Sequence, residues 1–235
     1  MCIRDRFDTP QAILSYSGTG LTKLSQQYHE IIREHICRGA YKHAKRPILI
    51  NNWEATYFNF NEEKILKIAE QAQKLGIEML VLDDGWFGKR EDDNSGLGDW
   101  FVNEKKMNGS MAQLAEKIHK MGMKFGLWFE PEMISEDSDL YRAHPDWAFA
   151  IPGRVPNHSR NQLVLDMTRE DVREYLLERL TTIVHDAKID YVKWDMNRSV
   201  CDVYSHVAAQ SRNGELYHRY VLGVYDCLLY TSPSP

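Results

Sequence analysis

Charged side chains follow several short apolar runs of the sequence. In the segment 191–195, the two-residue period of a strand places Lys193 and Asp195 on one face and Val192 and Trp194 on the other. A cation beside a carboxylate favours the charged form, so we expect Asp195 to be ionised at neutral pH and suited to act as a nucleophile. The alternative is a structural ion pair at a strand end. We expect Trp194 to pack in the core.

Two adjacent carboxylates, Asp83 and Asp84, stand where the apolar run 78–82 turns into a loop. Such a turn can direct both side chains at one ligand, and paired acceptors suit neighbouring hydroxyls of a sugar. Four tryptophans offer apolar faces for a sugar ring: Trp53, Trp86, Trp100 and Trp128. The alternatives are an Asx turn at Asp84 and core packing for most of the tryptophans.

A loop rich in Pro, Asn, Ser and Arg precedes Leu163 and contains Arg160. Its guanidinium could fork onto a carboxylate or a pair of hydroxyls, although an isolated arginine is more often a solvated charge at the rim of a site. We expect no cofactor from these residues.

No metal site is predicted. The segment 92–96 is similar to a calcium loop, but Asn103 stands where the closing Glu should be, and the nine histidines form no HxxxH or HExxH pattern. The cysteines are scattered without a CxxC pair, which fits neither a zinc site nor a disulfide framework; they are Cys2, Cys37, Cys201 and Cys227.

The elements that must position these side chains alternate between strands and helices. Strands are predicted at 48–50, 78–82, 124–129 and 189–194, with a further short run at 163–165, and amphipathic helices at 61–75, 111–121 and 168–183. This alternation predicts an α/β fold with a parallel sheet. No glycine-rich phosphate loop follows the first strand, and polar residues follow each strand, so we favour about the first half of a (β/α)8 barrel over a doubly wound sheet. Four or five of the eight barrel strands are then present.

A helix predicted over 21–38 precedes the barrel and ends near Gly39. The ends, MCIRDR (1–6) and CLLYTSPSP (227–235), resemble translated adapter sequence. We therefore expect an internal fragment of a longer protein, with residues 7–46 as a connector segment and residues 47–226 as the N-terminal half of the barrel.

Composition restricts the class of protein. The chain has 235 residues, of which 43% are hydrophobic and 27% charged, so we expect a globular protein and exclude disorder. The formal charge of −5, without a basic stripe, argues against nucleic-acid binding. No apolar run is long enough to span a membrane, so we expect no membrane association and a cytosolic location.

Five collinear motifs carry a specific resemblance. NNWEATYFNF, LVLDDGWFGKR, GLWFEPEM, RNQLVLDM and YVKWDMNR, in this order, resemble the retaining alpha-galactosidases (melibiases) of glycoside hydrolase family 36. The resemblance covers nearly everything from residue 7 to residue 226. It implies that an N-terminal β-sandwich, and a later barrel strand that carries the general acid/base aspartate, are both absent from this chain.

The resemblance also implies roles for single residues. Asp195 matches the nucleophile, and Asp83 and Asp84 match the pair that hydrogen-bonds the axial 4-hydroxyl and the 6-hydroxyl of galactose. Further residues that match the sugar site are Trp53, Trp128, Arg160, Lys193 and Asn197.

The expected function is retaining hydrolysis of melibiose- or raffinose-type alpha-galactosides. The expected partner is a small oligosaccharide, the full-length protein is expected to be a homo-oligomer, and the fragment alone is expected to be inactive. One alternative is an alpha-N-acetylgalactosaminidase or a galactosyl transferase similar to raffinose synthase. More distant alternatives are an aldolase that forms a Schiff base on Lys193 and a sugar-binding remnant without catalysis.

Overall fold

The computed structural model describes residues 11–39 and 41–231. These residues divide into two units, one that contains residues 11–39 and 41–45 and one that contains residues 46–231. The first unit contains α1 (Leu21–Ile31), which continues as a π-helical segment, η1 (Ile32–Ile36). The helix predicted over 21–38 is therefore confirmed, and it ends where the backbone of Cys37 becomes extended. Its role as a connector stays a prediction.

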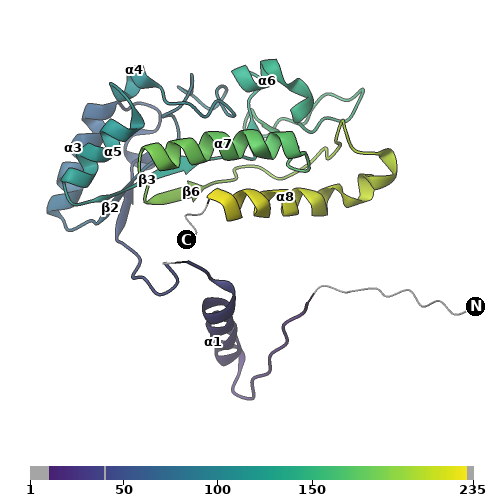
Figure 1. Cartoon of the computed structure of the whole chain (residues 1–235), viewed down its shortest axis with the longest axis horizontal. Coiled ribbons are helices and arrows are strands. Elements are labelled where there is room, and N and C mark those ends of the chain that lie inside the picture. The colour runs from purple at the N-terminus through teal and green to yellow at the C-terminus, as the bar shows by residue number, and fades with distance from the viewer. Residues whose placement is uncertain (1–10, 40, 232–235) are drawn as a thin grey trace, which may run out of the picture. The chain divides into compact units, whose positions relative to one another are not determined.

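A parallel sheet forms the centre of the second unit (Figure 1). Its strands are β1 (Leu49–Asn51), β2 (Met79–Leu82), β3 (Lys124–Phe129) and β6 (Tyr191–Trp194), and they lie side by side in this order. The predicted α/β fold with a parallel sheet is confirmed. Strand order follows chain order, as a (β/α)8 barrel requires and a doubly wound sheet does not, while closure into a barrel stays a prediction.

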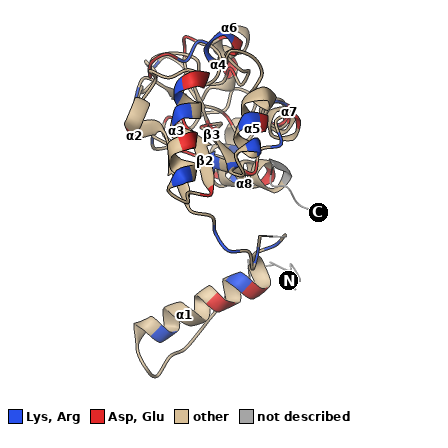
Figure 2. Ribbon diagram, turned by 90° about the vertical axis from the view of Figure 1, so that its left-hand side faces the viewer, with Lys and Arg blue, Asp and Glu red and all other residues tan. Residues whose placement is uncertain are grey.

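Each connection between neighbouring strands contains a helix whose ends follow from local sequence. Helix α3 (Glu62–Lys74) joins β1 to β2, and the side chain of Asn61 caps it by accepting from the backbone N–H of Lys64. Helix α5 (Met111–Lys120) joins β2 to β3 and begins with a capping box between Ser110 and Gln113. Charges of both signs alternate along the outer face of α3 (Figure 2).

Helix α7 (Glu170–Asp186) joins β3 to β6 and begins two residues later than predicted. Thr168 lies before its first turn and donates through its backbone N–H and its hydroxyl to Asp166 Oδ1. An Asx turn thus precedes the helix, and the expected side-chain cap of the helix is absent.

The short run at 163–165 is not a strand of the parallel sheet, so the prediction of a possible fifth barrel strand is wrong. Strand β5 (Leu163–Val164) pairs antiparallel with β4 (Met133–Ile134) in a separate two-stranded sheet. A short buried strand is apolar whether it pairs in a parallel or in an antiparallel sheet, so periodicity could not distinguish these two cases. This ribbon lies in the long connection that follows β3.

Several elements were not predicted from the sequence. They are α2 (Trp53–Thr56), α4 (Glu104–Met107), α6 (Asp139–Ala143), η2 (Pro145–Trp147), η3 (Gln210–Glu215) and α8 (Leu216–Thr231). Helix α8 packs beside α7, continues past residue 226 and buries Cys227, whereas residues 1–6 lie outside the described residues (Figure 1). Among the helices at 11–39 and 41–231, none has both the length and the apolar content needed to cross a membrane.

The outer edges of the parallel sheet are open in this chain. Within the described residues, β1 pairs with β2 alone and β6 pairs with β3 alone. Apolar side chains on these outer strands remain exposed: Leu49 at 44% and Tyr191 at 41%. An unpaired strand edge with exposed apolar groups is a site for aggregation.

We therefore predict that this chain, expressed alone, aggregates or binds a dye that reports exposed apolar surface. Light scattering and dye fluorescence measure this directly. A monodisperse protein with a sharp thermal transition, and with hydrolysis of nitrophenyl alpha-galactoside, would contradict the prediction.

Candidate active site

Asp83 connects three strands at the carboxyl end of the sheet. Its side chain is almost fully buried, and its Oδ2 accepts from Asn51 Nδ2 on β1 at 2.5 Å and from Lys193 Nζ on β6 at 2.7 Å. Its backbone N–H donates to Asn52 Oδ1 at 2.7 Å. Asn51 and Asn52 were not among the predicted site residues, although both stand at the end of a predicted strand.

Lys193 favours the charged form of Asp195, as expected, but it is not the main cause of the low pKa of Asp195. Lys193 forms its ion pair with Asp83, and its charge lowers the pKa of Asp195 less than the hydrogen bonds to that carboxylate do. Lys193 lies in β6 and Asp195 directly follows that strand, and the long lysine side chain reaches across the sheet to Asp83. A buried carboxylate needs a counter-ion more than a half-exposed one does, which explains the pairing.

Hydrogen bonds from neutral groups surround Asp195 instead. Its Oδ2 accepts from Trp128 Nε1 at 3.0 Å and from Asn197 Nδ2 at 3.1 Å, and its Oδ1 accepts from the backbone N–H of Met196 at 2.9 Å. Partial burial by itself would raise the pKa of Asp195, but these donors outweigh it and hold the pKa below its ordinary value. The carboxylate is therefore ionised at neutral pH, as expected, and remains half-exposed.

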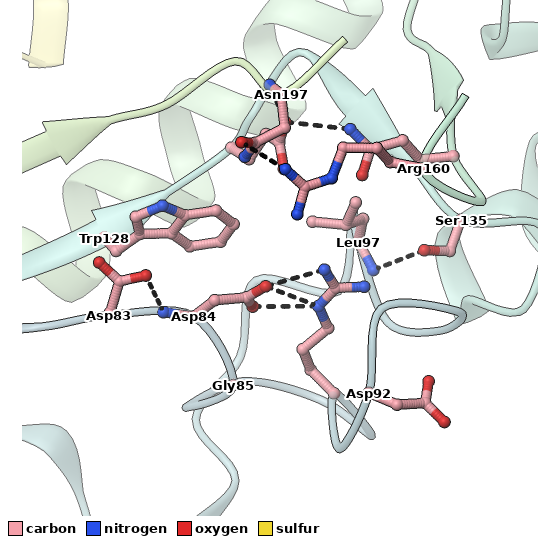
Figure 3. Close-up of polar contacts among 12 residues, drawn as sticks. Asp83, Asp84, Gly85, Asp92, Leu97, Trp128, Ser135, Arg160 and Asn197 are labelled. Atoms are coloured by element: carbon pink, nitrogen blue, oxygen red, sulfur yellow. Dashed lines mark hydrogen bonds and ion pairs between the residues drawn. The ribbon is translucent and has the colours of Figure 1, made fainter. Parts of the chain in front are cut away.

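Asp84 has a different partner, Arg90, which was not predicted from the sequence. The guanidinium forks onto the carboxylate, with Nη2 at 2.8 Å from Oδ2 and Nε at 3.0 Å from Oδ1, and Figure 3 draws both contacts among the dashed lines between Asp84 and Arg90. Burial raises the pKa of Asp84, and Arg90 opposes that rise. The alternative of an Asx turn at Asp84 is not observed; the carboxylate of Asp84 accepts from Arg90, and the backbone N–H of Asp84 donates to Asp83 Oδ1 at 2.9 Å.

Arg160 approaches the site from the connection that carries the β4–β5 ribbon. Its Nη1 donates to Asn197 Oδ1 at 3.1 Å, so its partner is an amide, and not a carboxylate as one interpretation of the sequence suggested (Figure 3). Arg160 is exposed and has a left-handed φ of 53°, a strained backbone conformation of the kind that clusters at functional sites. Asn197 thus joins Arg160 to Asp195.

A second carboxyl near Asp195, that of Glu130, was also not predicted. Glu130 follows β3, is 1% exposed, and accepts from the backbone N–H of Asn197 at 2.5 Å and from Gln162 Nε2 at 3.0 Å. Burial raises the pKa of Glu130. Glu130 stands in the motif GLWFEPEM, but nothing in the sequence indicated that its carboxylate would accept from the backbone N–H of Asn197.

The four predicted aromatic residues divide into two groups. Trp86 and Trp100 are core residues, with 0% and 1% exposure, so the alternative of core packing applies to them. Trp128 is also buried and presents its indole N–H to Asp195. Trp53 is half-buried in α2, where its ring meets the edge of Phe58 at a centroid distance of 5.1 Å.

The arrangement suits chemistry on a neutral polyol. A half-exposed carboxylate that is held ionised can attack an electrophilic carbon or stabilise a cation, and buried carboxylates beside it can accept hydrogen bonds from ligand hydroxyls. Within the described ranges, no group of three or more His, Cys, Asp and Glu side chains is placed to hold a metal ion.

Comparisons with known proteins agree with this chemistry. The profile of the family described as Melibiase matches residues 6–232. The bifunctional alpha-galactosidase/sucrose kinase AgaSK of Mediterraneibacter gnavus is 57% identical over 94% of this chain and 23% of its own length. Alpha-galactosidase Mel36A of Lactobacillus acidophilus is 53% identical over 95% of this chain and 31% of its own length.

Solved structures show the same similarity. The alpha-galactosidase AgaA of Geobacillus stearothermophilus superposes with a TM-score of 0.90 at 51% identity, covering 92% of this chain and 30% of that one. Variants of AgaA have been solved in complex with raffinose and with stachyose. The chain therefore spans less than a third of the length of these relatives.

Proposed function

The chain belongs to the melibiase family, and from that premise we propose that a full-length enzyme containing it is a retaining alpha-galactosidase. The reaction is hydrolysis of terminal, non-reducing alpha-D-galactosides through a covalent galactosyl-enzyme on Asp195. The observation that carries this proposal is the state of Asp195, which is half-exposed and receives three hydrogen bonds that favour its charge.

In this reaction the Asp195 carboxylate attacks the anomeric carbon as the bond to the leaving oxygen breaks. A second carboxyl, about 5–5.5 Å away, protonates that oxygen and later activates the water that hydrolyses the galactosyl ester. We assign this acid/base role to an aspartate on a later barrel strand than β6, in line with the family resemblance. The transition state is cation-like, so an ionised Asp195 stabilises it before the new bond is complete.

Recognition of galactose is assigned to the residues around Asp195. Asp83 and Asp84 are acceptors for the axial 4-hydroxyl and the 6-hydroxyl, and Trp53 offers a half-buried ring at the side of the site. Lys193, Arg160 and Asn197 supply donors. The raffinose and stachyose complexes of AgaA support melibiose- and raffinose-type oligosaccharides as the substrate class.

The geometry favours a hydrolase over a Schiff-base aldolase. An aldolase lysine must present a free amine to a carbonyl carbon. Lys193 Nζ instead forms an ion pair with Asp83 Oδ2 at 2.7 Å. Its orientation is therefore directed to a buried carboxylate.

Activity tests use a full-length enzyme that contains this chain, for example a chimera in which residues 11–231 replace the matching segment of AgaA. A folded, unsubstituted chimera without alpha-galactosidase activity would contradict the proposed function.

The first prediction concerns the nucleophile. Asp195→Asn should abolish measurable turnover of nitrophenyl alpha-galactoside, because an amide cannot form the glycosyl ester. Asp195→Gly with added azide should release beta-galactosyl azide, since azide occupies the space of the nucleophile and attacks the face opposite the leaving group. Asp186→Asn, at the exposed end of α7, is the control. A near-native rate in Asp195→Asn excludes Asp195 as the nucleophile.

The second prediction concerns sugar selectivity. Asp84→Asn keeps the shape of the side chain but weakens it as an acceptor, so kcat/KM on a galactoside should fall at least about tenfold, as expected for an unpaired buried polar group. The loss on a matched glucoside, which has no axial 4-hydroxyl, should be smaller. Equal losses on both sugars would make the role of Asp84 structural. Asp92→Ala, at an exposed site in the same loop, is the control.

The third prediction concerns the pKa of Asp195. Trp128→Phe removes a donor that lowers this pKa, so the pKa should rise. The acid limb of kcat/KM should then move to higher pH, with the largest relative loss at the acid end of the profile. Trp147→Phe is the matched control, because Trp147 stacks on His144 away from Asp195. An unmoved acid limb in Trp128→Phe would show that the indole N–H does not set the charge of Asp195.

A further inference from the structure

Arg90 is 2% exposed and stands beside the sugar site, although it is absent from the predicted site residues. We propose that Arg90 is a positioning residue for substrate binding, which fixes the orientation of the Asp84 carboxylate toward the hydroxyls of the galactose ring. This inference rests on the proposed function, because Arg90 supports Asp84, one of the residues proposed there to select galactose.

The contacts of Arg90 determine the plane and the position of the carboxylate. Nε lies 3.0 Å from Asp84 Oδ1 and 3.2 Å from Oδ2, and Nη2 lies 2.8 Å from Oδ2. Nη1 donates to the backbone carbonyl of Ser95 at 2.8 Å. One planar group therefore links the carboxylate to the far side of its own loop. A lysine ammonium cannot reproduce this fork, since it is a point charge on a flexible stem.

Packing holds Arg90 in place at its guanidinium and at its backbone. The guanidinium Cζ lies 5.5 Å from the ring centroid of Phe58, the same ring that meets Trp53. The loop closes on the backbone of Arg90 at Gly96, where φ is 83° and an added Cβ would lie 3.1 Å from the Arg90 backbone nitrogen. Phe58 is thus a shared support of two proposed sugar contacts, Trp53 and Asp84.

The two adjacent carboxylates use separate cations. Asp83 is paired with Lys193, and Asp84 is paired with Arg90. Neither carboxylate therefore shares its counter-ion with the other. A substitution at Arg90 therefore removes the cation of Asp84 and leaves that of Asp83 in place.

The charged groups around Asp84 determine in which direction its pKa should change. Burial and the neighbouring Asp83 raise the pKa of Asp84, and Arg90 lowers it. Lys106 of α4 is a second cation near Asp84. It donates to the backbone carbonyl of Gly85 at 2.9 Å, and burial lowers its pKa while the negative charge of Glu91 raises it. Weakening the Arg90 fork therefore raises the pKa of Asp84 and moves the loss of substrate affinity at acid pH to higher pH.

The experiment is Arg90→Lys in the full-length enzyme. KM for nitrophenyl alpha-galactoside should rise at least about tenfold, with a smaller change in kcat, because the fork acts on ground state and transition state alike. The acid limb of kcat/KM should move to higher pH, and the thermal midpoint should stay close to that of the unsubstituted enzyme. Arg142→Lys is the control, since Arg142 pairs with Asp137 and Asp139 at an exposed position.

A folded Arg90→Lys enzyme with unchanged KM and pH profile overturns the inference. If Arg90→Lys does not fold, Arg90→Gln combined with Asp84→Asn removes both charges and leaves none buried without a partner. The double variant should then have the KM of Asp84→Asn alone, whereas a KM equal to the product of two independent effects overturns the inference. Loss of hydrolysis in the unsubstituted enzyme would contradict the proposed function instead.

Discussion

The ion pair between Asp83 and Lys193 is the constraint on which the rest of the site depends. Asp83 is 3% exposed, so its charge must be matched inside the protein, and the lysine that matches it comes from β6, two strands away in the sheet. Removing Lys193 would leave the buried carboxylate of Asp83 without its cation, which is destabilising. The pair therefore couples the strand ends, and it also determines which carboxylates receive a cation.

Because Lys193 pairs with Asp83, neutral donors contribute more than Lys193 to keeping Asp195 charged. The indole of Trp128, the amide of Asn197 and a backbone N–H surround it. Such donors favour the ionised form without placing a full positive charge against it. This leaves a carboxylate that is charged, oriented and still half-exposed, which is the combination a nucleophile needs.

Long connections after β2 and β3 supply the supports of these side chains. The loop after β2 returns Arg90 to Asp84, and the connection after β3 brings Gln162 and Arg160 to Glu130 and Asn197. Apart from Arg160, the residues proposed to touch the sugar stand at strand ends or just beyond, whereas their supports come from elsewhere in the chain. The sheet thus sets where these side chains stand, and the loops orient them and supply a counter-ion for Asp84.

The sequence by itself determined the elements that have a period: the parallel strands, the helices between them, the connector helix, and the polar residues at the strand ends. These depend on side-chain alternation and on helix caps, which are local. Only the tertiary structure decided the partners of each charge. Lys193 paired with Asp83 and not with Asp195, Arg90 and Glu130 joined the site, and the run at Leu163 paired outside the parallel sheet. The physical reason is that burial sets how much a carboxylate needs a cation, and burial belongs to the packed fold and not to any local spacing.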